Sequence, residues 1–336
     1  MRSAHHLRAR NAAHSAASAK STEKSTRISR KLRDQLKASL HGIFVRGQRF
    51  GWDVLPRHFY SAIPEIHGLE NSQSWRAPFS MFGVDGADIE SQLSFAGGCC
   101  LPPLPERLTV AGIYERACEE NGAPGYGLIE AEFLFCFITT KRPNKIVQVG
   151  SGVSTAVIQM AAKEAGYKPT IVCIDPFPTE YLIRAARDNL IQLIPQPAQE
   201  VDIGLLTDLE AGDLLFVDST HTVRPGSEVN RIILEVLPRL ASGAFVHFHD
   251  IFLPYDHQCN VLDTLFFWEE STLLHAFLIH NRRYAIAVCL SMLHHACPEK
   301  LQALLPNYRP AFMKDGLSAM GGDPGHFPTA AYLFVR

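Results

Sequence analysis

Three small residues stand where an apolar run ends and a helical pattern begins. Gly150, Ser151 and Gly152 follow the run Lys145–Val149 and precede a helical pattern that opens near Ser154. A glycine pair at a strand-to-helix turn lets the backbone approach a ligand closely. The N-terminus of the following helix favours a carboxylate or phosphate group. The turn therefore predicts a small-molecule site, with a tight turn that holds no ligand as the alternative.

An acid follows the next apolar run. Asp175 comes directly after Thr170–Ile174, 23 residues beyond Gly152. An acid at this place can accept hydrogen bonds from both hydroxyls of a ribose. Together with the glycine turn, it predicts an adenosine-containing ligand, but the pair does not separate a dinucleotide from S-adenosylmethionine. A turn or helix N-cap aspartate is the alternative.

A third motif offers a base. Asp218 ends the apolar run Asp213–Val217, and His221 follows three residues later. With an ordinary pKa near 6.5, an imidazole can take a proton from a substrate at neutral pH. We therefore expect His221 to be a reachable general base beside the ligand.

A fourth motif ends the run Ala244–Phe248. His249 and Asp250 stand at its tip, and alternation along a strand places His247 and His249 on one face. Asp218, His249 and Asp250 together predict a site for a divalent metal such as Mg²⁺. The alternative is a hydrogen-bonded polar cluster without a metal.

The elements that must position these residues alternate along the chain. Strands are predicted at Lys145–Val149, Thr170–Ile174, Ile191–Ile194, Asp213–Val217, Ala244–Phe248, Tyr284–Leu290 and Ala331–Val335. Helices are predicted at Ser154–Ala165, Thr179–Asn189, from a cap at Ser227 to Leu240, and at Leu265–His280. Alternating strands and helices predict an α/β fold with a doubly wound sheet. Ligands bind such a sheet at the carboxyl ends of its strands, where the four motifs lie.

The helix at Leu265–His280 begins beside aromatic and acidic residues. Phe266, Phe267 and Trp268 are interpreted as core residues. Glu269 and Glu270 are interpreted as an acidic first turn, which is favourable at a helix N-terminus.

The N-terminal third differs in texture and charge. Residues 1–28 are predicted to be a disordered basic tail, residues 29–125 a helical and irregular cap region, and residues 126–336 the main domain. Residues 1–49 hold 12 Lys and Arg against two acids, whereas the remainder holds 20 against 32. An acidic body argues against a nucleic-acid groove across it.

Cysteine usage and hydropathy bear on location. The eight cysteines form no C-x-x-C motif, and the chain is long enough to need no disulfides, so a reducing compartment is expected. No apolar run approaches the ~18–20 residues of a membrane helix. The N-terminus lacks the apolar segment of a secretory signal, although its Arg- and Ser-rich composition also resembles an organellar transit peptide. We expect a cytoplasmic protein.

As a set, the motifs resemble the class I S-adenosylmethionine-dependent methyltransferases, in particular a bacterial branch with small-molecule and sugar O-methyltransferases. The matching stretches are Ile146–Thr155, Ile171–Pro178, Gly212–His221, Gly226–Leu240 and Phe245–Pro254, and the resemblance covers about residues 125–336. It implies a Rossmann-like seven-stranded sheet that ends in an antiparallel hairpin.

The resemblance implies roles for single residues. The cofactor would be held by Gln148, Gly150, Ser151, Gly152, Ser154, Asp175 and Asp218. The two glycines would lie under its methionine part and Asp175 would bind its ribose. The family usually has an acid where this chain has Gln148, so the cofactor's amino group would meet an amide without a full charge.

The expected reaction is in-line methyl transfer to an oxygen of a small-molecule acceptor. His221, His249 and Asp250 would face the acceptor, with His221 or His249 as the base and a metal such as Mg²⁺ as an optional aid. One alternative is an NAD(P)-dependent oxidoreductase, which Thr155 disfavours because that motif has a third glycine there. Another is a non-catalytic protein that binds S-adenosylmethionine or S-adenosylhomocysteine. The sequence leaves a homo-oligomer open and does not fix the oligomeric state.

Overall fold

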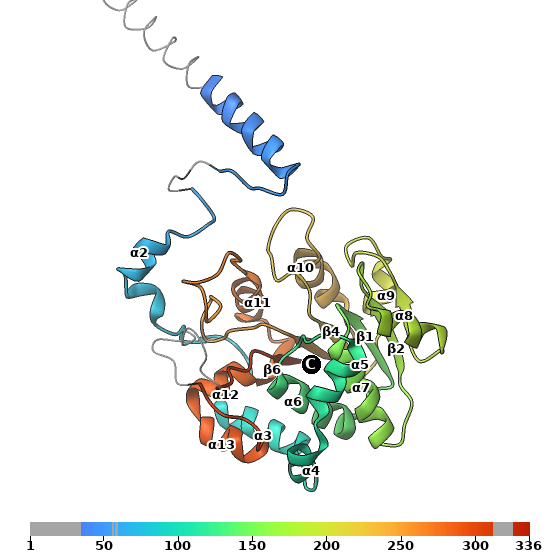
Figure 1. Cartoon of the computed structure of the whole chain (residues 1–336). Coiled ribbons are helices and arrows are strands. Elements are labelled where there is room, and N and C mark those ends of the chain that lie inside the picture. The colour runs from blue at the N-terminus through green and yellow to red at the C-terminus, as the bar shows by residue number, and fades with distance from the viewer. Residues whose placement is uncertain (1–34, 56, 58–59, 312–324) are drawn as a thin grey trace, which may run out of the picture. The chain divides into compact units, whose positions relative to one another are not determined.

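The computed structural model describes residues 35–55, 57, 60–311 and 325–336 (Figure 1). The chain divides into two compact units, residues 1–64 and 65–336. In the first unit, residues 35–48 form a helix. The predicted basic tail, residues 1–28, lies outside the described residues, as does the predicted start of a helix at Ser29.

The second unit is built on a seven-stranded sheet with the order β3-β2-β1-β4-β5-β7-β6. The strands are β1 Lys145–Val149, β2 Thr170–Ile174, β3 Gln192–Ile194, β4 Leu214–Val217, β5 Phe245–Phe248, β6 Tyr284–Cys289 and β7 Ala331–Val335. The pairs among β1 to β5 are parallel, and β7 is antiparallel to both β5 and β6. This confirms the predicted doubly wound sheet with its antiparallel hairpin.

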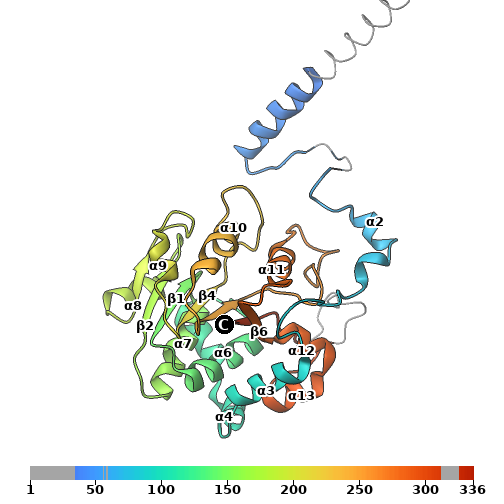
Figure 2. The ribbon, with the colours of Figure 1, turned by 180° about the vertical axis from the view of Figure 1, so that it is seen from behind.

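Both faces of the sheet are covered, which is why its strands are almost wholly apolar. Along β1, Ile146 belongs to one apolar core and its neighbours Val147 and Val149 belong to the other. The first core includes residues of α5 Ile113–Asn121, α6 Leu128–Lys141, α7 Val153–Glu164 and α8 Glu180–Arg187. The second includes residues of α9 Ile203–Thr207, α10 Glu228–Arg231 and α11 Glu270–Leu278. Seen from two opposite sides, α10 and α11 lie across the sheet from α6 and α7 (Figures 1 and 2).

The segment before the sheet also packs on it. It contains α2 Ile66–Glu70, the 3-10 turn η1 Ser74–Arg76, α3 Ile89–Cys99 and α4 Leu104–Ala111, followed by α5. Helix α3 contacts β6, α6 and two helices near the C-terminus, α12 Leu290–Ala296 and α13 Pro298–Leu304. Residues 65–125 thus share one compact unit with the sheet, and the cap role given to residues 29–125 stays a prediction.

Two predicted helices behave differently at their starts. Ser227 caps α10 as predicted, since its hydroxyl accepts from Asn230 N at 3.3 Å. The helical path continues through a π turn, η2 Ile232–Val236, and a 3-10 turn, η3 Leu237–Arg239. The helix predicted from Leu265 instead begins at Glu270, and Phe266 is 66% exposed, so its interpretation as core was wrong.

All eight cysteines are free thiols, and six of them are buried. Among the described residues, none of the helices has the length and apolar character that crossing a bilayer requires.

Candidate functional site

The glycine turn after β1 lies against the end of β4. Gly150 has φ +79°, and a Cβ there would lie 1.7 Å from the carbonyl oxygen of Asp218. Gly152 has φ +145°, a backbone conformation that only glycine readily adopts, and a Cβ there would lie 3.1 Å from Asn121 Oδ1. Both glycines are therefore required by backbone conformation and by close approach, which brings the first and third motifs together.

Asp175 ties the second motif to the first. Its Oδ2 accepts from Ser151 N at 3.1 Å, and its Oδ1 accepts from Phe177 N at 2.9 Å. The residue is partly exposed, whereas the hydroxyl oxygen of Ser151 is buried and has no partner within the described residues. The turn after β1 and the end of β2 thus form one polar edge.

Gln148 faces the first turn of α7. It is fully buried, its Nε2 donates to Ser154 Oγ at 3.1 Å, and its Oε1 accepts from Thr155 Oγ1 at 2.8 Å. Two predicted cofactor contacts, Gln148 and Ser154, are therefore engaged with each other beneath the turn. Their direct contact with a cofactor stays a prediction.

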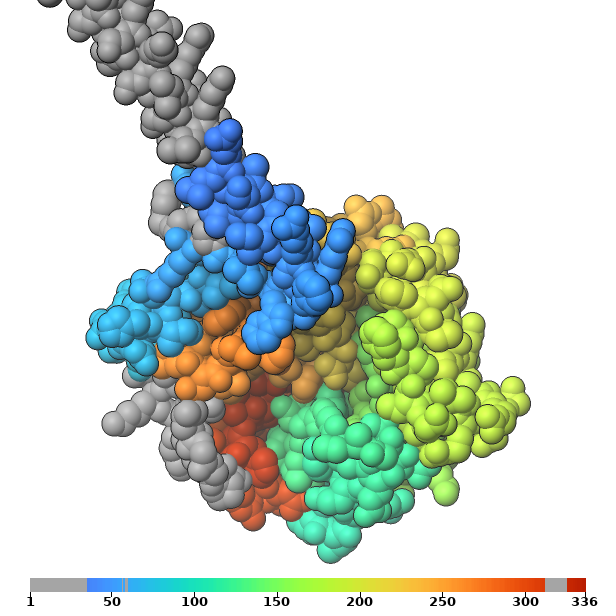
Figure 3. All heavy atoms as spheres, turned by 45° about the horizontal axis from the view of Figure 1, so that its top comes forward, coloured from blue at the N-terminus to red at the C-terminus, as the bar shows by residue number. Residues whose placement is uncertain are grey.

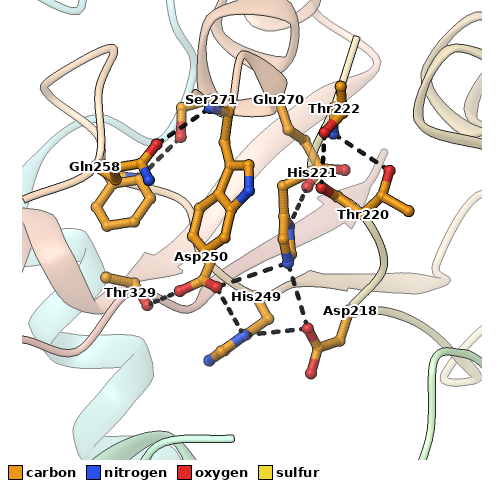
Figure 4. A network of polar contacts seen from close by, with 12 residues as sticks. Asp218, Thr220, His221, Thr222, His249, Asp250, Gln258, Glu270, Ser271 and Thr329 are labelled. Carbon is orange, nitrogen blue, oxygen red and sulfur yellow. Dashed lines mark hydrogen bonds and ion pairs between the residues drawn. The ribbon is translucent and has the colours of Figure 1, made fainter. Parts of the chain in front are cut away.

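The remaining predicted residues converge beyond the ends of β4 and β5 (Figure 4). Asp218 Oδ1 lies 3.2 Å from His249 Nδ1 and 3.5 Å from His221 Nε2. Asp250 Oδ2 lies 3.6 Å from each of these two nitrogens. The four side chains form a ring in which carboxylates and imidazoles alternate, and we call it the His–Asp cluster.

The backbone at this cluster is strained. His221 has φ +57° and Asp250 has φ +52°, a left-handed conformation that side chains other than glycine rarely adopt. Such residues cost of the order of 1–3 kcal/mol each and gather at functional sites. Neighbouring hydrogen bonds hold both turns, because Thr220 N and Oγ1 donate to Glu228 Oε1 at 3.0 and 2.6 Å and Thr329 Oγ1 donates to Asp250 Oδ1 at 2.9 Å.

Glu270 is a site residue that sequence reasoning missed. It is the first residue of α11, as expected of an acidic helix start, but its carboxylate is 1% exposed and its Oε2 lies 2.8 Å from His221 Nδ1. The other oxygen, Oε1, is buried without a partner among the described residues. The two residues are 49 positions apart, so no local spacing signals this pairing.

Interactions within the His–Asp cluster shift the pKa values of its side chains. Burial alone would lower the pKa of His221, but Asp218 and Glu270 raise it to about 10. Burial likewise opposes charge on His249, yet Asp218 and Asp250 raise its pKa to about 9. Burial disfavours a charged Asp218, but the two imidazoles hold its pKa well below the ordinary value. With only protons bound, both histidines are therefore cations at neutral pH and cannot accept a proton.

Aromatic rings flank the cluster on both sides. The ring of Tyr126, just before α6, lies 4.7 Å from the ring of His249. The ring of Trp268, just before α11, lies 4.9 Å from the ring of His221. The surface of the second unit is hollowed between the teal segment of α5 and the orange segment of α11 (Figure 3). His247 lies deeper, stacks on Phe216 at 4.2 Å, and has a pKa well below its ordinary range because of burial.

The cluster departs from the donor set that Mg²⁺ prefers. Asp218, His249 and Asp250 do come together as predicted, and His221 joins them as a second nitrogen donor. Mg²⁺ is held mainly by carboxylates and water. A ring in which half the donor atoms are imidazole nitrogens does not fit it, so no step is assigned to Mg²⁺.

Comparison with known proteins points to one family. Residues 147–251 match the family model described as a methyltransferase domain, and this stretch runs from β1 to just beyond the cluster. An uncharacterized protein from Archaeoglobus fulgidus is 31% identical over 190 residues, which are 52% of this chain and 80% of that protein.

Two solved structures resemble the chain at low sequence identity. A methyltransferase from Podospora anserina bound to S-adenosylhomocysteine is 15% identical, with a TM-score of 0.37, covering 70% of this chain and 89% of that one. A putative O-methyltransferase from Klebsiella pneumoniae is 13% identical, with a TM-score of 0.39, covering 67% of this chain and 90% of that one. At these TM-scores the similarity carries no information about an acceptor.

Proposed function

The chain belongs to the class I S-adenosylmethionine-dependent methyltransferases, and we propose that it methylates an oxygen atom of a small-molecule acceptor. The observation that supports this most is the position of the His–Asp cluster. Its Asp218 directly abuts Gly150, so the proposed cofactor turn and a group of acids and imidazoles share one edge of the sheet. A methyl donor and a deprotonated oxygen need this adjacency.

We propose that the cofactor lies over the turn after β1. Each carboxylate oxygen of Asp175 accepts one backbone hydrogen bond, and an ionised carboxylate oxygen can accept a second. Asp175 can therefore bind both ribose hydroxyls without releasing Ser151 or Phe177. Gly150 and Gly152 keep the turn free of side chains, and Gln148 with Ser154 supports it from below.

The protein's part in the reaction is alignment and proton removal. Holding the acceptor oxygen in line with the methyl–sulfur bond contributes ~7–11 kcal/mol at best, and a positioned base adds ~10²–10⁴-fold. The proposed base is drawn from His221, His249 and Asp250. An imidazole acts as a base only after the network has given up one of its protons.

The alternative of an NAD(P)-dependent oxidoreductase is not supported. The family match covers β1 to β5. Strand β7 lies between β5 and β6, and the antiparallel pair of β6 and β7 distinguishes this fold from a nicotinamide-type sheet. The free thiols of all eight cysteines support the proposal of a cytoplasmic location, and a homo-oligomer is retained as a proposal.

Calorimetry with S-adenosylhomocysteine tests the cofactor. We expect saturable binding to the wild type, none of NAD⁺, and loss of binding in Asp175→Ala. Asp188→Ala is the matched control, since Asp188 ends α8 away from the turn. Binding of NAD⁺ alone would refute the proposal.

Turnover tests the acceptor class. Release of S-adenosylhomocysteine is followed with a panel of hydroxylated and aminated small molecules. Activity confined to amines would contradict oxygen as the acceptor atom. The double change His221→Ala, His249→Ala should leave cofactor binding intact and stop turnover, and turnover that survives it would show that neither imidazole is the base.

A further inference from the structure

We propose that residues 35–55 bind the anionic surface of a lipid bilayer, with the helix of residues 35–48 lying in the plane of that surface. We call residues 35–55 the basic amphipathic segment. The inference goes beyond the proposed function, because binding to vesicles can be measured without a cofactor or an acceptor.

Apolar side chains form one stripe along the helix of residues 35–48. Leu36, Leu40, Ile43 and Phe44 follow the i, i+4, i+7, i+8 spacing that places side chains on one face of an α-helix. Leu36 is 61% exposed and Ile43 is 50% exposed. A helix of a globular protein usually buries such a stripe against a core.

The two apolar cores of the second unit do not include this stripe. Among the described residues, the first member of one core is Met81 and the first member of the other is Ala96. No described residue of the basic amphipathic segment belongs to either core. An apolar stripe that stays exposed on a charged segment marks an interaction surface.

The turn after the helix extends the apolar stripe. Phe50 N and Trp52 N both donate to Gly47 O, at 2.9 and 3.0 Å. A Cβ at Gly47 would lie 2.7 Å from Trp52 O and 3.5 Å from Val54 Cγ2, so the returning chain passes close over this residue. Phe50 is 81% exposed and Trp52 is 72% exposed. Trp is enriched where a bilayer meets water, because its ring is apolar and its N–H is polar.

Cations flank the apolar stripe. At about 100° of rotation per residue, Lys37 and Arg46 lie on opposite sides of the stripe, and Arg49 follows in the turn. All three side chains are exposed. Residues 1–49 as a whole hold 12 Lys and Arg against two acids. Phosphate groups of anionic lipids attract such charge, and each cation near the surface strengthens binding about fivefold.

Charge and apolarity together favour a bilayer over other anionic partners. Nucleic acid and acidic protein surfaces attract cations, but a row of phosphates offers no apolar layer for Leu36 and Ile43. An amphipathic helix with Lys and Arg beside an apolar face lies in the bilayer interface, with the apolar face buried among the acyl chains. The exposed Trp52 and Phe50 fit the same interface.

Flotation of the full chain with vesicles tests the inference. We expect binding to vesicles of equimolar phosphatidylglycerol and phosphatidylcholine at low salt, and binding about 100-fold weaker to phosphatidylcholine alone. Tryptophan emission of the wild type should shift to shorter wavelength on binding, and the shift should be smaller in Trp52→Phe. Equal binding to the two kinds of vesicle, or binding to neither, would overturn the inference.

Charge variants locate the surface. The test variant combines Lys37→Gln, Arg46→Gln and Arg49→Gln, and it should bind anionic vesicles about 100-fold more weakly than the wild type, about fivefold for each cation. The matched control removes the same charge from three exposed positions of the second unit: Lys163→Gln, Lys168→Gln and Arg282→Gln. Equal weakening by the two variants would mean that net charge alone, and not this segment, drives binding.

Apolar variants test the stripe. Leu36→Gln and Ile43→Gln should each weaken vesicle binding at least about 10-fold, because burial of the side chain among the acyl chains is lost. Val110→Gln is the matched control, since Val110 is 85% exposed on α4. Circular dichroism and the urea midpoint check that each variant is folded. Unchanged binding in folded Leu36→Gln and Ile43→Gln would overturn the assignment.

Two other occupants of the surface have their own readouts. Binding to duplex DNA or to RNA that is tighter than binding to anionic vesicles would make nucleic acid the partner and overturn the inference. A dimer in vesicle-free solution that Leu36→Gln and Ile43→Gln dissociate would make a second copy of the chain the occupant, and it would also overturn the inference.

Binding of S-adenosylhomocysteine is measured on the same samples and should be unchanged in all these variants. Failure of the membrane surface and failure of the proposed function are therefore distinguishable.

Discussion

Glu132 tests how burial of a carboxyl group changes its pKa and, through it, the free energy of unfolding of this protein. It lies within α6 and is 3% exposed, and its Oε1 accepts from Asn307 Nδ2 at 2.6 Å. Burial raises its pKa to about 7, although the hydrogen bond from Asn307 opposes the shift. The folded state therefore binds a proton that the unfolded chain has lost above its ordinary pKa of 4.5. The free energy of unfolding falls as pH rises from about 4.5 to about 7 and is flat above that range.

The magnitude follows from the two pKa values. A pKa shift of one unit corresponds to 1.36 kcal/mol, so moving from pH 5 to pH 8 costs about 2.5 kcal/mol at this residue. Glu132→Gln keeps the shape and the acceptor for Asn307 but has no charge. The free energy of unfolding of this variant, relative to wild type, should therefore rise by about 2.5 kcal/mol over that range.

Urea unfolding of both proteins at pH 5, 6, 7 and 8 measures this difference, and other titrating groups cancel in it. Glu119→Gln, at an exposed position on α5, is the matched control and sets the baseline for an exposed carboxylate. A constant difference between Glu132→Gln and wild type over the four pH values, within about 0.5 kcal/mol, would refute the reasoning.

Three further changes probe other parts of the argument. Gly150→Ala should cost at least about 1–2 kcal/mol from its left-handed backbone alone, and more from the clash with Asp218, measured as a lower midpoint in urea; an unchanged midpoint would contradict the required close approach. Ser227→Ala should cost about 1 kcal/mol because the cap of α10 is lost, whereas Ser227→Gly should cost only a few tenths. Burial lowers the pKa of His294 to about 4, so the free energy of unfolding should fall as pH falls from 6.5 to 4. The free energy of unfolding of His294→Gln, relative to wild type, should therefore rise by about 3 kcal/mol between pH 7 and pH 4. Parallel plots of the free energy of unfolding against pH for the two proteins would exclude this cause.

The sheet was predictable because its strands are buried on both faces. A strand such as Lys145–Val149 has to be apolar along its length and to end at a turn, and both signals are local in the sequence. Parallel strands then bring their carboxyl ends to one edge, so the meeting of Gly150, Asp175, Asp218 and His249 followed from the fold class.

Other parts of the site depend on contacts that local patterns do not encode. The pairing of Glu270 with His221 joins positions 49 residues apart, and at sequence level Glu270 resembles any acidic helix start. The amide of Gln148 turns to Ser154 because α7 supplies hydroxyl partners for it, a choice set by packing. Phe266 is exposed although it belongs to an apolar triplet, since the helix predicted over it begins only at Glu270.

The position of β7 has a consequence for the order in which the molecule folds. It is the last strand in sequence, yet it lies between β5 and β6, which cannot pair until it arrives. Contacts of long sequence separation form slowly, and until then β5 and β6 present open edges that can pair with other chains. Thr329, just before β7, accepts from Ile251 N at 2.7 Å and holds Asp250. During synthesis on the ribosome, the glycine turn after β1 can form well before β7 emerges, whereas Asp250 gains its hydrogen bond from Thr329 only after residue 329 has been synthesised.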